Sequence, residues 1–130
     1  LRPRGRMAIV LPDSILGNPS DGYIREFIRA HSRILAVVDC PTETFMPSSG
    51  TKTSVLFLLK KEKDEKIEDY PIFLAVAKKC GHDRRGKEVY KMDSEGSFLL
   101  DDADNRILDD DLPEIARAYK RFREENNVRF

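Results

Sequence analysis

Cysteine and histidine are scarce in this chain of 130 residues, which has only two of each: Cys40, Cys80, His31 and His82. Zinc needs three or four protein ligands, so His82 near Cys80 is not a metal pair and no metal is expected. His31 is expected at the end of a helix, where a helix C-terminus favours a basic side chain. Two cysteines fit a reduced, cytoplasmic protein, and a disulfide between them is the less favoured alternative.

Long apolar runs and a net charge are also missing. No run approaches the ~18 residues of a membrane span, and no signal peptide is recognisable. Lys and Arg balance Asp and Glu at 23 each, so the charge of the whole chain indicates no partner. Residues 1–60 carry eight basic and five acidic residues, a net charge of +3, and residues 61–130 carry −3. A basic first half is compatible with an anionic ligand, although on charge alone an ordinary solvated surface is the favoured explanation.

The length predicts one domain, residues 1–130, with a sheet-forming part at 5–92 and an acidic loop and terminal helix at 93–130. Residues 1–5 (LRPRG) lead directly into a predicted strand, so we expect the chain to be a piece of a longer protein. No internal repeat is evident.

The first 40 residues predict a strand, a helix and a second strand. Residues 6–11 (RMAIVL) and 33–39 (RILAVVD) are nearly continuous apolar runs, as in strands buried on both faces. Between them, Ser20 or Asp21 can cap a helix whose apolar face consists of Tyr23, Ile24, Phe27 and Ile28. This succession predicts a right-handed βαβ unit of a parallel sheet.

The rest of the chain predicts two more strands and a helix. Strands are expected at 53–60 (TSVLFLLK) and 70–79 (YPIFLAVAKK), and residues 87–91 could pair back as a hairpin after the turn at 81–86. Residues 93–111 are acidic and loop-like. A helix is expected at 111–125, where Asp111 and Glu114 have the spacing of a capping box and Leu112, Ile115, Tyr119 and Phe122 line one face.

The most informative stretch is FMPSSGTKTSVLFLLKK, from Phe45 to Lys61. It follows GRMAIVLPDSIL (5–16) and RILAVVDCP (33–41), and CGHDRRGKEVYK (80–91) and DDDLPEIARAYKRF (109–122) come after it. In this order and spacing, these segments resemble the late part of the N6-adenine DNA methyltransferases. The similarity is greatest to the modification subunit of type I restriction systems, and it covers residues 5 to 124.

The resemblance implies a fold and a chemistry. It implies an α/β fold: part of a Rossmann-like S-adenosylmethionine-dependent methyltransferase sheet, with added antiparallel strands and a C-terminal helix. Such enzymes flip the target adenine out of the duplex. They hold its amino group with an Asn/Asp-Pro-Pro-aromatic tetrapeptide, and a Gly-rich loop holds the cofactor. We find neither motif here, so no catalytic or cofactor-binding residue is predicted; Asn18-Pro19-Ser20 is interpreted as a helix start.

The resemblance also implies contacts to DNA. In the family, an aromatic residue just before the strand at 53–60 stacks on the flipped base, and Phe45 is the candidate; alternatively it closes the edge of the core. Lys52 and Thr51, in the same loop, are candidates for DNA contact, as are Arg84 and Arg85. For Lys52 a solvated loop residue is the alternative, and for the arginines a charged hairpin tip.

Other residues are expected beside the site or away from it. Pro12 and Asp13 end the first strand at its carboxyl edge, where open α/β sheets place ligands, and they are candidates to line the site. The acidic cluster would repel DNA and is expected to face solvent or another subunit. Its members are Asp101, Asp102, Asp104, Asp109, Asp110 and Asp111.

By resemblance, the intact protein transfers a methyl group from S-adenosylmethionine to N6 of adenine in DNA, with specificity and restriction subunits of a type I system as partners. This chain alone is expected to be inactive. Two alternatives stay open: a non-catalytic assembly or DNA-contact module, and a related methyltransferase acting on RNA or on a protein glutamine. Self-association through the predicted edge strand Met7–Leu11 is also expected.

Overall fold

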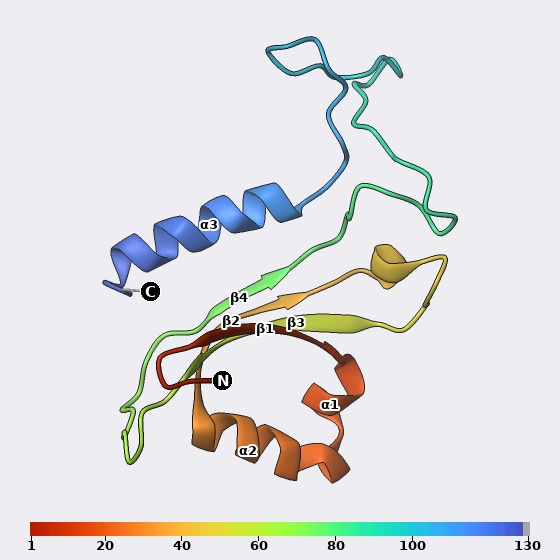
Figure 1. The fold of residues 1–130 in the computed structure, drawn as a ribbon. Helices are drawn as coiled ribbons and strands as arrows, with labels where there is room; N and C mark the ends of the chain where they lie inside the picture. The colour runs from red at the N-terminus through yellow and green to blue at the C-terminus, as the bar shows by residue number, and fades with distance from the viewer. Residues whose placement is uncertain (129–130) are drawn as a thin grey trace.

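A computed structural model describes residues 1–128 and contains one four-stranded sheet with helices on both faces (Figure 1). The strands are β1 (Arg6–Pro12), β2 (Ser32–Asp39), β3 (Thr53–Lys60) and β4 (Phe73–Val76), arranged in the order β1-β3-β2-β4. Helices α1 (Asp13–Gly17) and α2 (Gly22–His31) lie on one face, and α3 (Leu112–Glu125) lies on the other. The α/β fold class predicted from the sequence is confirmed.

Strand β3 sits between the two strands of the predicted βαβ unit. It runs antiparallel to both, pairing Arg6 with Leu59 on the β1 side and Asp39 with Ser54 on the β2 side. Strands β1 and β2 therefore run in the same direction but are not neighbours. The sheet is mixed, because β4 adds to the outer edge of β2 in parallel. Strand β1 lies at the other edge, with Met7 39% and Val10 46% exposed.

Strand β4 is shorter than the predicted 70–79. It pairs only with residues 36–39 of β2, and a register shift between Ile34 and Ala36 interrupts β2 just before that point. At the irregularity, the Ile34 amide donates to the Tyr70 hydroxyl (3.0 Å), and the Arg33 guanidinium lies over the Tyr70 ring. A side chain thus replaces the strand hydrogen bonds that residues 70–72 were expected to make.

In the connection from β1 to β2, α1 is followed by a short 3-10 helix, η1 (Pro19–Asp21), confirming that Asn18-Pro19-Ser20 starts a helix. The Asn18 side chain accepts from the Ser20 amide, and Asp21 precedes α2 without a side-chain capping bond. The predicted apolar face of α2 is only half correct. Ile24 and Ile28 are half-buried, whereas Tyr23 and Phe27 are exposed at 71% and 63%.

The core is centred on β3, since both of its edges are paired. Alternate residues of this strand face opposite sides. Leu56 and Leu58 are buried at 2% exposure each, and Leu35, Ala36 and Val38 of β2 are also buried. On the α3 side, Phe57 remains 37% exposed, because α3 covers that face only in part.

Helix α3 is confirmed, but its predicted capping box is wrong. The Asp111 carboxylate does not cap α3; it accepts from the backbone amides of Lys78 (2.8 Å) and Lys79 (2.9 Å). Glu114 pairs instead with Arg117 at 2.8 Å. These two amides follow β4, so Asp111 fastens the start of α3 to the end of the sheet. The Phe73 ring packs against Tyr119 and Phe122 of α3, with ring centroids 5.4 and 5.5 Å away.

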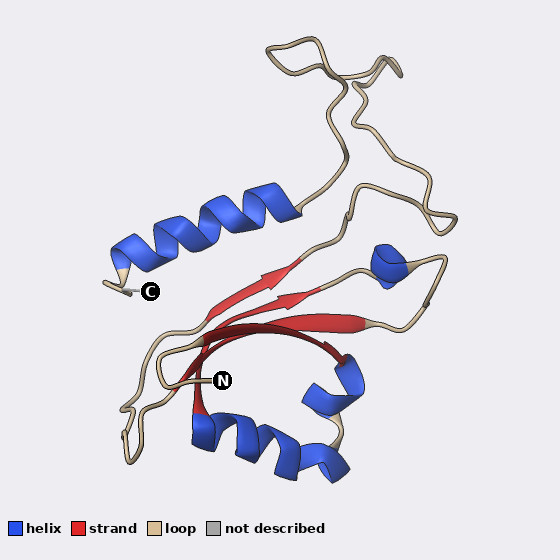
Figure 2. Ribbon diagram, viewed as in Figure 1, coloured by secondary structure: helices blue, strands red, loops and turns tan. Residues whose placement is uncertain are grey.

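Residues 80–110 form a projection that we call the arm, drawn mostly as loop in Figure 2. It contains three similar turns: the first lies within the predicted turn at 81–86, whereas the other two, and the repeat that the three form, were not predicted. Each turn begins with an aspartate whose carboxylate accepts from the amides two and four residues later, at 2.8–3.0 Å: Asp83, Asp93 and Asp101. The fourth residue of each turn has positive φ: Gly86, Gly96 and Asp104.

Two rings of backbone hydrogen bonds hold the three turns together. The amides of Lys91, Leu99 and Ile107 donate in a closed cycle, to the carbonyls of Ile107, Lys91 and Leu99 respectively. Gly81, Val89 and Asp109 form an equivalent cycle. The hairpin expected at 87–91 is thus only a single bridge from His82 to Glu88 inside a three-part unit.

None of the helices formed by residues 1–128 has the length and apolar character needed to cross a bilayer. Cys40 is buried, Cys80 is half-buried, and both are free thiols, in agreement with the expected absence of a disulfide.

Candidate functional site

A charged cluster lies at one edge of the sheet, where β1 and β2 end and β3 begins. The Lys52 ammonium group bonds to Asp39 at the end of β2, and its Nζ lies 3.3 Å from Asp13, directly after β1. The Ser54 hydroxyl lies 2.8 Å from the Asp13 carboxylate and 3.2 Å from that of Asp39. Because β3 lies between β1 and β2, it brings together two aspartates that are 26 positions apart in the chain.

Opposite charges hold the cluster together. The hydrogen bond from Lys52 holds the pKa of Asp39 below its ordinary value, against the opposing effect of burial. Burial lowers the pKa of Lys52, but its hydrogen bonds and charge interactions with Asp39 and Asp13 raise it overall. Lys52 and Asp39 are therefore both charged near neutral pH, and the single ammonium group is shared by the Asp39 and Asp13 carboxylates.

We predict that Lys52→Met lowers the free energy of unfolding by about 1 kcal/mol, since the three side chains are each more than a third exposed and exposed pairs contribute little. The variant leaves Asp13 and Asp39 facing each other without a counter-ion. Urea unfolding at pH 7 measures the loss. Lys52→Met combined with Asp39→Asn is the control, and it should recover most of the difference.

The pH dependence of this effect has a defined sign. A carboxyl with a lowered folded pKa stabilises the protein above its unfolded pKa of about 3.9, and the stabilisation is lost as the pH falls through the folded value. The difference between wild type and Lys52→Met should therefore shrink below about pH 4. A difference that stays constant from pH 7 to pH 3 would contradict the assignment.

Phe45 lies in a short 3-10 helix, η2 (Thr42–Phe45), inside the loop that was predicted to be irregular. Its side chain is 41% exposed and stands between two hollows. The larger, of about 500 Å³, is apolar and lies between the sheet and α3; Val55, Phe57 and Tyr119 also line it. The smaller, of about 430 Å³, is shared with the base of the arm. One part of the ring therefore packs in the protein while another is accessible.

The arm holds the Phe45 loop in place. His82 donates from Nε2 to the Glu43 carbonyl oxygen at 2.8 Å, which fixes the proton on that nitrogen because a carbonyl can only accept. Gly86 approaches the same loop, and a Cβ placed on it would lie 3.2 Å from Pro47 Cδ. The role of His82 is structural, and no group of metal-ligating side chains occurs within residues 1–128.

Cys40 lies between the charged cluster and the Phe45 loop. It follows Asp39 directly, and its buried side chain lines the same apolar hollow as Phe45. Burial raises the pKa of the Cys40 thiol, and Lys52 partly offsets this effect. The thiol is therefore neutral at pH 7 and serves as an apolar packing group, not as a nucleophile.

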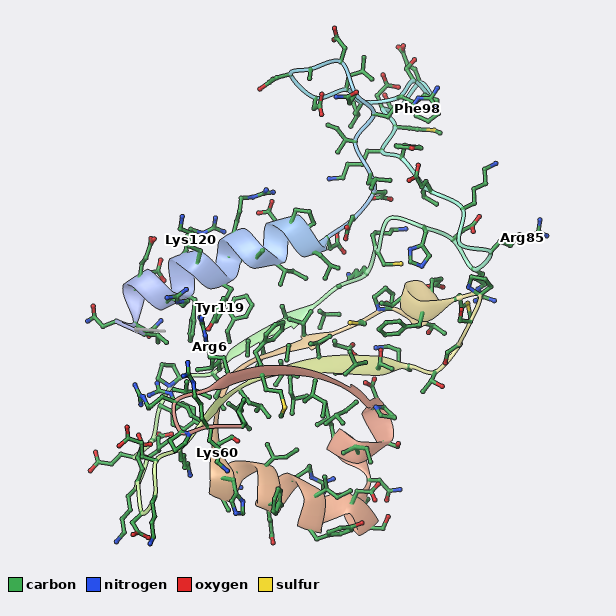
Figure 3. All side chains as sticks on the ribbon, in the orientation of Figure 1. Arg6, Lys60, Arg85, Phe98, Tyr119 and Lys120 are labelled. Atoms are coloured by element: carbon green, nitrogen blue, oxygen red, sulfur yellow. The ribbon has the colours of Figure 1, made fainter. Side chains whose placement is uncertain are left out.

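The structure brings some of the predicted site residues together and separates others. Pro12 is the last residue of β1 and directly precedes Asp13. Thr51 directly precedes Lys52, and its exposed hydroxyl lies 3.2 Å from the Ser49 hydroxyl. Arg84 and Arg85 are on the first turn of the arm, where Figure 3 shows Arg85 extending away from the body. Arg84 Nε lies 3.8 Å from the Glu43 carboxylate, in the same segment as Phe45.

Asp39 and Ser54 were not among the predicted site residues. The available signal was an aspartate at the end of each of two buried strands, with a lysine directly before a third. That pattern indicates a cluster only once β3 is known to lie between β1 and β2 and to run antiparallel to both.

The described residues thus define an α/β protein with a half-exposed aromatic loop beside a cluster of one lysine and two aspartates at one sheet edge. The N-6 DNA Methylase family model matches residues 1–130, so the chain belongs to that family. A Listeria monocytogenes crystal structure, described as a class I S-adenosylmethionine-dependent methyltransferase, matches with 24% identity and a TM-score of 0.45. The match covers 58% of this chain and 23% of that one. A search of curated proteins gives no match.

Proposed function

We propose that this chain is the late part of an enzyme that transfers a methyl group from S-adenosylmethionine to N6 of adenine in DNA. The observation that carries the proposal is membership of the N-6 DNA methylase family over residues 1–130. In the proposed protein, the chain supplies one wall of the target-base site. Phe45 stacks on the flipped base, and Thr51, Lys52, Arg84 and Arg85 lie toward the DNA.

The position of Lys52 refines its proposed role. Its ammonium group is already engaged by Asp39 and Asp13. A phosphate would have to compete with two carboxylates for it. We therefore assign Lys52 to fixing the start of β3 and the end of the Phe45 loop, with a phosphate contact as a secondary role. Arg85 is freer to meet a phosphate, because it extends from the exposed first turn of the arm (Figure 3). Arg84 is exposed beside it, although it lies 3.8 Å from the Glu43 carboxylate.

The residues that follow β1 and β2 do not fit a cofactor site. Strand β1 leads directly into α1 through Pro12 and Asp13, and β2 leads into Cys40-Pro41, so neither is followed by a glycine-rich turn. Such a turn is what lets backbone amides approach a cofactor closely. The proposal therefore places the cofactor-binding and catalytic groups outside this chain, and the chain alone is expected to be inactive.

The test is methyl transfer by the intact protein that contains this chain, with radiolabelled S-adenosylmethionine and adenine-containing duplex DNA. We expect labelled N6-methyladenine, and in isothermal titration the 130-residue chain alone should not bind S-adenosylmethionine at micromolar concentration. Label in RNA or in a protein glutamine, but not in DNA, would replace the proposed substrate. No transfer to any of the three would favour a non-catalytic assembly module.

The same proposal includes the cellular location of the intact protein and its partner subunits. The intact protein works in the cytoplasm as part of a type I restriction-modification system, with specificity and restriction subunits as partners. Association of two copies of this chain through the exposed edge of β1 remains a prediction. The supporting observation is that β1 has β3 on one side, and its Met7 and Val10 are partly exposed.

A further inference from the structure

The outer part of the arm exposes a group of large apolar side chains. Met92 and Leu100 are 54% and 52% exposed. Leu99, Leu108 and Phe98 follow at 41%, 39% and 38%. Met92 and Phe98 face each other across a backbone bridge, and Figure 3 places Phe98 far from the sheet. Contiguous apolar groups that remain exposed on a folded protein commonly mark an interaction site.

The charge around this group selects the chemistry of the partner. Residues 92–110 contain seven acidic residues and a single basic one, Arg106, a net charge of −6. Arg106 lies over the Phe98 ring at 4.0 Å, so it is already used within the arm. A surface of this charge repels nucleic acid and attracts a positively charged protein surface. Of the other basic residues of the arm, Arg84, Arg85 and Lys87 lie in or directly after the first turn, next to the Phe45 loop, and Lys91 directly precedes Met92.

The arm is already built before any partner arrives. The aspartate-anchored turns and the two backbone rings satisfy its polar groups locally, so its shape does not depend on a hydrophobic core. A surface that is ordered in advance loses little conformational entropy on binding. The exposed apolar side chains are thus presented in a fixed arrangement, at the end of the arm opposite to the turn that carries Arg85 (Figure 3).

We propose that the outer part of the arm, residues 92–110, is a docking surface for another polypeptide, which presents an apolar patch surrounded by Lys and Arg. Met92, Phe98 and Leu100 form the apolar contact, and Glu95, Asp102 and Asp104 form the acidic rim. The inference goes beyond the proposed methyl transfer. It can fail separately, since its test contains neither cofactor nor substrate.

The test uses the full chain and a defined probe: a fluorescein-labelled 18-residue amphipathic peptide with leucine on one helical face and lysine on the other. Fluorescence anisotropy at 150 mM NaCl should show saturable binding. Met92→Ser with Leu100→Ser should weaken it at least tenfold. Glu95→Gln with Asp102→Asn should weaken it most at low salt. The anchoring aspartates are left intact, so the arm keeps its fold.

Tyr23→Ser with Phe27→Ser is the matched control, because it removes two apolar groups from α2 that are more exposed than Met92 and Leu100, and it should leave peptide binding unchanged. Circular dichroism checks that each variant is folded. The proposal is overturned if the peptide does not bind or if Met92→Ser with Leu100→Ser binds it normally. It is equally overturned if a labelled 20-base-pair duplex binds residues 92–110 as tightly, or if sedimentation shows that the same residues join two copies of this chain.

Discussion

Replacing Leu58 by alanine is expected to lower the free energy of unfolding by about 3 kcal/mol, the largest effect of any single truncation in this chain. Leu58 lies at the middle of the sheet on β3, and it is 2% exposed. Removing its side chain takes away buried apolar surface and leaves a cavity on one face of the sheet. Since both edges of β3 are hydrogen-bonded, the strand cannot move inward to close that cavity.

The matched control is Leu74→Ala on β4. It makes the same chemical change at a side chain that is 72% exposed, and it should cost within about 0.5 kcal/mol. Urea unfolding of the three proteins measures the difference, and thermal unfolding should place the Leu58→Ala midpoint roughly 10 °C lower. Equal losses for the two variants would mean that β3 is not the centre of the core.

The strand predictions succeeded where the apolar runs were continuous. Residues 53–60 form β3 as predicted, and 6–12 and 32–39 differ from the prediction by one residue each. Burial on both faces, predicted for both of these runs, fits β2 but is wrong for β1, which is an edge strand without a buried residue. The apolar runs do not specify the order of the strands in the sheet. The βαβ pattern suggested neighbouring parallel strands, and only the return of β3 between them shows that the sheet is mixed.

Polar contacts of side chains with the backbone account for the predictions that failed. Asp111 and Glu114 have capping-box spacing, but the Asp111 carboxylate reaches two amides that lie 32 and 33 residues earlier, and no local rule contains that contact. The repeat in the arm was available in the sequence as an aspartate followed three residues later by Gly, Gly or Asp. The repeat was not predicted, because most positions within each turn vary and only a few residues determine the shape of the turn.

The site could be predicted in its parts but not in its assembly. Asp13 and Lys52 were candidates for separate reasons, one as a strand end and the other as a loop cation. The structure joins them with Asp39, and it thereby turns a candidate phosphate ligand into the counter-ion of two carboxylates. Phe45 was identified by its place before a strand. The dependence of its loop on His82 and Gly86 needed the three-dimensional arrangement of the arm.

Phe45→Ala in the intact protein is expected to weaken binding of a duplex with an extruded target base by about tenfold to a hundredfold, because stacking on an aromatic ring contributes about 1–3 kcal/mol per base. The ring is suited to this role since part of it is exposed, while the rest is held between the apolar hollow and the base of the arm. A duplex with 2-aminopurine at the target position reports on stacking directly, because stacking quenches its fluorescence. In the variant, the extruded base should stay bright.

Two further variants separate stacking from packing. Phe45→Tyr keeps a flat ring and should restore both affinity and quenching, whereas Phe27→Ala removes an exposed ring from α2 on the opposite face and should change neither. If Phe45 only closes the edge of the core, Phe45→Ala will lower the unfolding temperature and leave DNA affinity within twofold of wild type. Normal quenching of 2-aminopurine by Phe45→Ala would assign the stacking ring to another residue of the intact protein, and the loop at 42–52 would then serve to support β3.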